Sequence, residues 1–283
     1  MYITRVSLLF FLIVLSGTII ARNDNLPVGA RSAGIGNSSV ALSDVWSLQH
    51  NQAGLANLKY LEVGIYANRN NLLNEASQIS FAGAMPTKYG VFGLTFQQYG
   101  FKLYNESKLG FAYSKAFGPN FRAGLMANYL QTSIGENYGK SANFCLEGGV
   151  QGQLVKNLWI GVHVYNINRT KASNFYGEKI PTITRIGLLY QVSEKVFASA
   201  EVEKDLVNNA MFKGGAEYRA NENFYLRGGF YFVQNPVYTF GVGFYTKNIR
   251  IDFAGSFHQR LGFTPHLGLG YLNYKPAVTK ENQ

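Results

Sequence analysis

The sequence predicts an all-β fold: a closed antiparallel outer-membrane β-barrel of about fourteen strands, with an N-terminal plug segment in the lumen. Runs of alternating apolar and polar residues, each about ten residues long, recur over residues 60–274, and turn-forming residues separate them. A segment rich in Gly and Ser precedes these runs. Of the 283 residues, only 15% are charged and another 15% are aromatic. This combination is typical of strands that present an apolar face to lipid and a polar face to a lumen.

Residues 1–21 predict a secretory signal peptide. Arg5 supplies a basic start, residues 6–15 form an apolar run, and Ala21 ends a short segment suited to cleavage. The apolar run is shorter than the roughly 20 residues that a spanning helix needs. An uncleaved membrane anchor is the alternative, but no Lys/Arg cluster follows the run. No other stretch approaches this apolar length, so we expect strands to cross the membrane.

Residues 22–59 are predicted to form the plug segment. Gly and Ser weaken both helix and strand formation, because glycine loses more conformational entropy than other residues on folding. Spaced apolar residues such as Ile35, Trp46 and Leu55 nevertheless suit a compact segment that packs against a larger body. The positions expected to characterise the plug are Gly29, Arg31, Gly34, Gly36, Asp44, Asn51 and Gly54.

Residues 60–274 are predicted to form the barrel. Side chains alternate across a strand, so one face of residues 144–154 should be apolar and the other polar. The apolar face has Phe144, Leu146, Val150 and Leu154, and the polar face has Cys145, Glu147, Gln151 and Gln153. Such runs begin near Leu61, Ser77, Val91, Lys108, Phe121, Asn143, Leu158, Thr182, Val196, Met211, Phe224, Tyr238, Ile249 and His266. An even number of strands is expected of a bacterial single-chain barrel.

The connections between the runs predict the orientation of the barrel. Every second connection is a tight turn, as at residues 86–90, 118–120 and 156–157. Most of the others are expected to be longer and polar, above all residues 168–181. Short periplasmic turns and longer extracellular loops alternate in outer-membrane barrels. Both termini should therefore be periplasmic, with residues 275–283 as a polar periplasmic tail.

The polar face of the strands predicts a lumen lined by paired charges. We expect Arg122 to lie beside Glu147, Arg185 beside Glu201, and Glu217 beside Arg227, each pair worth about 0.2–1 kcal/mol. The full predicted set is Arg122, Glu147, Arg185, Glu201, Glu203, Lys213, Glu217, Arg227, Arg250 and Asp252. Small residues on the same face should leave room for the plug; they are Gly149, Gly187, Gly215 and Gly229.

A secreted β-sandwich or a soluble ligand-binding barrel is the alternative fold. Either would turn the apolar faces inward, and a barrel of about fourteen strands would then enclose a void. The many charges of opposite sign on the polar face suit a closed lumen better than a solvated exterior.

Composition and motifs exclude several other function classes. The formal net charge of +10 favours a membrane surface over nucleic acid in a chain this aromatic, and basic loop residues suit lipopolysaccharide. Ser39 stands where a dinucleotide-binding loop would need a third Gly. The four His residues are scattered, the single Cys145 forms no framework, and no nucleophile motif is present. We therefore expect no catalytic residue, no cofactor and no metal.

Three motifs of the plug segment carry a family resemblance: residues 29–36 (Gly-Ala-Arg-Ser-Ala-Gly-Ile-Gly), 40–44 (Val-Ala-Leu-Ser-Asp) and 51–55 (Asn-Gln-Ala-Gly-Leu). They resemble the start of the long-chain fatty-acid transporter (FadL-like) superfamily, and more closely the PorV and PorQ barrels of the type IX secretion system. In this chain Ile35 replaces the usual Met, Val45 the second acid and Gln52 the usual Pro.

The resemblance implies two functions. FadL-like transporters bind a hydrophobic ligand in the barrel, whereas the type IX barrels act through protein partners in an outer-membrane complex. A polar, charged lumen favours the partner-binding function, because burying an apolar ligand among charges would desolvate them. Transport of a small hydrophobic molecule is the alternative. For that function, a small apolar pocket could be lined by Trp46, Leu189, Phe197 and Tyr231.

Overall fold

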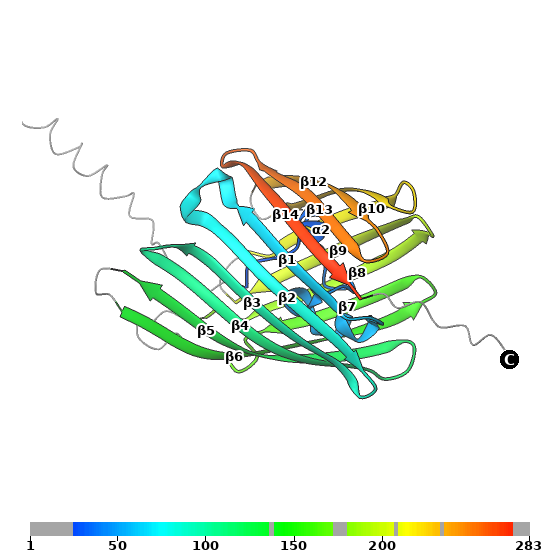
Figure 1. The fold of residues 1–283 in the computed structure, drawn as a ribbon, viewed down its shortest axis with the longest axis horizontal. Helices are drawn as coiled ribbons and strands as arrows, with labels where there is room; N and C mark the ends of the chain where they lie inside the picture. Colours follow the sequence, from blue (N-terminus) through cyan, green and yellow to red (C-terminus); the bar gives the residue numbers. More distant parts are fainter. Residues whose placement is uncertain (1–24, 136–138, 172–179, 207–208, 233–234, 274–283) are drawn as a thin grey trace, which may run out of the picture.

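The computed structural model describes residues 25–135, 139–171, 180–206, 209–232 and 235–273. The predicted signal peptide, most of the loop at 168–181 and the predicted tail lie outside these residues. Fourteen strands form one closed antiparallel barrel (Figure 1). Each strand pairs with its neighbours in sequence, and the first pairs with the last. The predicted fold class is confirmed.

The strand bounds agree closely with the alternating runs. In chain order they are β1 (Glu62–Arg69), β2 (Ser77–Thr87), β3 (Gly90–Phe101), β4 (Tyr104–Ala116), β5 (Phe121–Ile134), β6 (Gly139–Val155), β7 (Leu158–Tyr165), β8 (Ile183–Ser193), β9 (Val196–Asp205), β10 (Met211–Arg219), β11 (Phe224–Phe232), β12 (Pro236–Tyr245), β13 (Ile249–His258) and β14 (Gly262–Leu272).

Burial follows the predicted alternation of faces. On β6, Phe144 and Leu146 are 68% and 48% exposed, whereas Cys145 and Glu147 are buried. Exposed large apolar side chains lie on the outer face of every strand except β7, whose outward apolar residues are half-buried. Such a surface is far larger than the apolar patches that soluble proteins expose. Among the described residues, no helix is long and apolar enough to span a membrane.

The connections agree with the prediction at one end of the barrel only. The turns that join β2 to β3, β4 to β5 and β6 to β7 are short, as expected. The expectation that most connections at the opposite end are longer is wrong. Only those between β1 and β2 and between β7 and β8 are long, while residues 102–103 alone join β3 to β4. Gly100, with φ of +100°, permits that tight connection.

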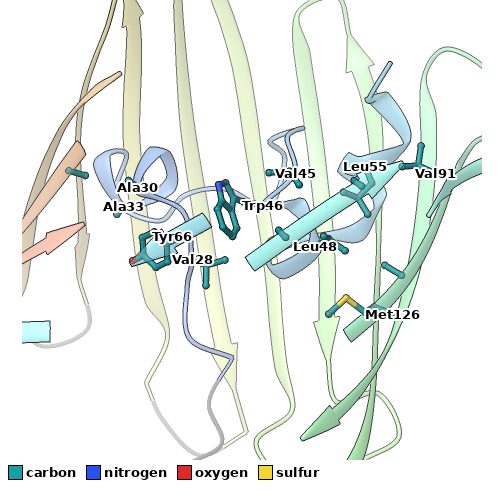
Figure 2. Close-up of a cluster of buried hydrophobic side chains, with 14 residues drawn as sticks. Val28, Ala30, Ala33, Val45, Trp46, Leu48, Leu55, Tyr66, Val91 and Met126 are labelled. Carbon is teal, nitrogen blue, oxygen red and sulfur yellow. The ribbon is translucent and has the colours of Figure 1, made fainter. Parts of the chain in front are cut away.

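Residues 25–58, called the lumen segment below, lie inside the barrel, where Figure 1 shows α2 enclosed by the strands. The segment contains α2 (Ala30–Gly34), α3 (Ser47–His50) and the 3₁₀ helix η1 (Gln52–Asn57). Its apolar side chains share a buried cluster with the inner face of the wall (Figure 2). The rings of Trp46 and of Tyr66 of β1 pack edge to face, with their centroids 5.9 Å apart. Packing against the wall therefore orders a segment whose own helix propensity is low.

Candidate functional site

Glycines of the wall allow the lumen segment to approach the strands closely. A Cβ atom at Gly215 of β10 or Gly229 of β11 would collide with the backbone of Ile35. One at Gly187 of β8 would lie 2.7 Å from Val40 Cγ1, and one at Gly149 of β6 would collide with the side-chain amide of Asn51. The four glycines expected to make room for the plug therefore all contact the lumen segment.

Arg31 is the centre of the first polar cluster. Its Nε and Nη2 donate to the two Glu217 oxygens, each at 2.8 Å, and its Nη1 donates to Asp44 at 3.2 Å. Arg227 contacts the same carboxylate at 2.6 Å and Asp252 at 2.6 Å. Burial lowers the pKa of Arg31, but its ion pair with Glu217 outweighs this effect and raises the pKa above the ordinary value. The cluster ties α2 to β10 through charges that are buried and paired.

Glu201 is the centre of the second cluster. Its Oε2 accepts from the backbone amides of Ser39 and Val40, both at 2.8 Å. Its Oε1 accepts from Lys213 Nζ at 2.8 Å, and the same ammonium contacts Glu203 at 2.8 Å. A carboxylate of β9 thereby satisfies two amides of the lumen segment that would otherwise be buried without partners.

Glu147 is the centre of a third cluster, and it is the one member of the cluster among the predicted lumen charges. Its carboxylate accepts from Lys108 at 2.8 Å, from Asn128 at 2.7 Å and contacts His163 at 2.9 Å. Lys108 also donates to Asn25 of the lumen segment at 2.9 Å. Lys108, Asn128 and His163 were missed as site residues. Their inward positions follow from the same alternation that identified Glu147.

Asn51 fixes the end of α3. Its amide nitrogen donates to the carbonyls of Val40 at 2.8 Å and Val150 at 3.1 Å, and its side-chain oxygen accepts from Ala53 N at 3.1 Å. Gln52, which departs from the motif of the resembling family, donates to Leu48 O at 2.9 Å.

The predicted plug glycines occupy constrained positions. Gly29 and Gly36 have φ of +92° and +68°. Gly34 packs on Gly241, and a Cβ at Gly54 would collide with Leu42 O. All seven predicted plug positions therefore have a contact or a backbone conformation that accounts for the residue type.

The structure corrects two of the three predicted charge pairs. Arg122 lies opposite Gln151 and not Glu147, and Arg185 lies opposite Glu203 and not Glu201. Antiparallel partners are equidistant from the connection between their strands, and the predicted pairs did not satisfy this condition.

The remaining predicted charges are paired within the wall. The pair between Glu217 and Arg227 is confirmed, and Arg185 contacts Glu203 at 2.6 Å. Arg250 contacts Glu62 of β1 at 3.3 Å, and this partner is not among the predicted charges.

A cavity of about 340 Å³ remains between the lumen segment and the wall, at the end of the barrel with the short turns. Leu189 and Phe197 line it as predicted, whereas Trp46 and Tyr231 do not. Its complete lining is Arg31, Ala41, Leu42, Ser43, Asn57, Arg122, Gln153, Asn157, Trp159, Leu189, Gln191 and Phe197. In the part of the chain that the structure describes, no three His, Cys, Asp or Glu side chains converge as they would around a metal ion.

Comparison with known proteins gives matches in structure alone. No protein-family model matches the chain, and no curated protein matches it. The Ralstonia pickettii toluene transporter TbuX superposes with a TM-score of 0.65 and 14% identity, over 86% of this chain and 97% of that one. The P. putida toluene transporter TodX gives a TM-score of 0.65 and 13% identity, over 88% and 98% of the two chains. A Pseudomonas aeruginosa FadL homologue gives 0.61 and 10%, over 87% and 97%. The chain therefore has the fold of FadL-type outer-membrane barrels.

Proposed function

We propose that this chain is an integral barrel of the bacterial outer membrane that passes small hydrophobic molecules, with the lumen segment as its plug. The observation that carries the proposal is a barrel with an apolar outer surface, whose interior is filled by a segment held through side-chain contacts. Fold similarity to two toluene transporters supports the hydrophobic class of the cargo. The short turns face the periplasm in this proposal, and lipid and lipopolysaccharide surround the barrel.

The charged lumen does not argue against this function in the way that the sequence alone indicated. The carboxylates of Glu201 and Glu217 are satisfied by the lumen segment and by neighbouring basic residues. They hold the plug and need not be desolvated by a passing ligand. A molecule can therefore use space that the segment opens when it moves, while the wall pairs stay intact.

Passage requires the lumen segment to shift, because the segment occupies the space between the strands. The segment is held by three polar clusters and by close contacts at glycines, all non-covalent. The tether between Arg31 and Glu217 is the contact that we expect to break first, because Arg227 remains to compensate Glu217.

A second candidate function is a barrel that acts through protein partners, as in a type IX secretion shuttle or anchor. The filled lumen favours this function. At the turn end, the lumen segment leaves a cavity of only about 340 Å³ between itself and the wall. Under this hypothesis the plug never moves, and a partner binds the outer ends of the barrel.

Purification in a gentle detergent from the native outer membrane distinguishes the two functions. Mass spectrometry is applied both to the extracted small molecules and to the co-purifying proteins. A bound hydrophobic molecule without a stoichiometric protein supports transport. A stoichiometric protein partner without such a molecule contradicts transport and supports the second function.

A further inference from the structure

The cavity at the short-turn end has an unusual distribution of charge. Two arginines, Arg31 and Arg122, line it, and none of its lining residues is acidic. Arg31 is already neutralised by Glu217 and Asp44. Arg122 has no carboxylate within ion-pair distance among the described residues, so it contributes an uncompensated positive charge to the cavity wall.

Neighbouring side chains hold the Arg122 guanidinium in place. Its Cζ lies 4.0 Å from the centre of the Trp159 ring, and its Nη1 donates to Ser43 Oγ at 3.1 Å. A guanidinium has five N–H donors in a fixed plane, and this contact with Ser43 uses one of them. The stacked arrangement therefore fixes the direction of the remaining donors, which is what bidentate recognition of a carboxylate requires.

The rest of the cavity combines an apolar wall with neutral polar groups. Leu42, Leu189 and Phe197 supply the apolar surface, together with Trp159. The side-chain amides of Asn57, Gln153, Asn157 and Gln191 supply the neutral polar groups. A volume of about 340 Å³ lies at the lower end of the range for small-molecule sites, which is roughly 300–1,000 Å³.

We propose that this cavity binds a small aromatic carboxylate, with the carboxylate on Arg122 and the ring against Leu189 and Phe197. The site is additional to the passage of neutral hydrophobic molecules proposed above. It lies at the turn end, between the lumen segment and strands β5 to β9, and involves residues of both. Binding in solution requires no transport, so failure of this proposal and failure of the proposed function give different results.

Isothermal titration calorimetry of the full-length protein in detergent tests the site, with benzoate as the probe. We expect saturable binding of benzoate, and binding at least about tenfold weaker for the neutral analogue benzyl alcohol and for inorganic phosphate. Equal affinities for benzoate and benzyl alcohol would show an apolar site without charge recognition and overturn the proposal. Absence of saturable benzoate binding, or tighter binding of phosphate, would overturn it as well.

Substitutions assign the binding to this cavity. Arg122→Gln should weaken benzoate binding about tenfold or more, and Arg122→Lys should give an intermediate loss because the charge stays but the planar fork is removed. Arg219→Gln is the matched control, since Arg219 ends β10 at the same end of the barrel but does not line the cavity. Heat-dependent mobility in gels verifies that each variant is a folded barrel. Benzoate binding that is unchanged in folded Arg122→Gln, or lost equally in Arg219→Gln, contradicts the assignment.

Discussion

Arg31 of the lumen segment and Glu217 of β10 are 186 positions apart in the chain, yet two hydrogen bonds of 2.8 Å join their side chains. Both groups are largely buried, and Arg227 approaches the same carboxylate from the wall. The pair therefore ties the interior of the barrel to its wall, where Arg227 alone faces the two carboxylates of Glu217 and Asp252.

Loss of this tether should open the lumen. Arg31→Gln removes the partner that belongs to the lumen segment, and with it the ion pairs to Glu217 and Asp44. We expect Arg31→Gln to raise the ion conductance of the barrel in planar bilayers. Arg250→Gln is the control, because Arg250 contacts Glu62 and Tyr245 of the wall. Equal conductance of both variants and the unaltered protein would show that the tether does not close the lumen.

Two adjacent glycines of β11, Gly228 and Gly229, distinguish the effect of crowding the lumen segment from the effect of replacing a strand glycine. A Cβ at Gly229 would collide with the backbone of Ile35, whereas one at Gly228 would meet no atom within 4 Å. Overpacking typically costs about 1–3 kcal/mol, so Gly229→Ala should lower the temperature at which the folded gel band is lost. Gly228→Ala should leave that temperature unchanged. A similar decrease for both variants would mean that the strand, and not the contact with the segment, determines the effect.

The direction of the β6 side chains should determine membrane insertion. Leu146 faces outward, and an arginine at the bilayer midplane on the lipid face costs about 2–4 kcal/mol. Leu146→Arg should therefore reduce the yield of folded protein in the outer membrane. Gln153→Arg is the matched inward control, because Gln153 lines the cavity, whereas Gln151 is fully buried against the carbonyls of Val40 and Leu42. Equal yields of the two variants would disprove the proposed facing.

His50 should make the packing of the lumen segment sensitive to acid. Burial and the nearby charge of Arg185 lower its pKa from 6.5 to about 4, against the opposing effects of the Val28 carbonyl, Asp44 and Glu201. Because the folded pKa is the lower one, the unfolded state binds more protons between these values, and stability falls as the pH decreases from 6.5 towards 4.

Urea unfolding at pH 7 and at pH 4.5 measures this effect. His50→Gln removes the titrating group while retaining a polar side chain, so we expect it to reduce the loss of stability on acidification. The comparison is made between the two pH values within each protein, which cancels any change in stability at neutral pH. An identical loss in both proteins would assign the acid sensitivity to other groups.

The sequence by itself determined the barrel and the facing of its side chains. The apolar and polar alternation of residues 144–154 has a period of two, which only a strand matches, and it placed Leu146 outside and Glu147 inside. The pair of Glu217 and Arg227 could also be predicted from the sequence, because the short turn at residues 220–223 fixes which residues lie opposite each other.

Counting outward from the turns would have found the partner of Arg122, because Gln151 lies as far from the connection between β5 and β6 as Arg122 does. The same counting fails for Arg185. The hairpin of β8 and β9 turns at Glu194 and Lys195, which would place Lys204 opposite Arg185, but a register shift between Gln191 and Ser193 brings Glu203 there instead. The first partner was therefore available from the sequence, whereas the second depends on an irregularity that the alternation does not reveal.

Only the tertiary structure decided how the lumen segment is held and where space remains beside it. No periodicity relates Arg31 to Glu217, or Ser39 to Glu201, because the segment is irregular and its contacts cross the lumen to distant strands. Closure of the barrel brings these strands around the segment, and that closure depends on all fourteen pairings together. The position of the cavity beside Arg122 and Trp159 follows from the same closure, because it is the volume that the segment leaves unfilled.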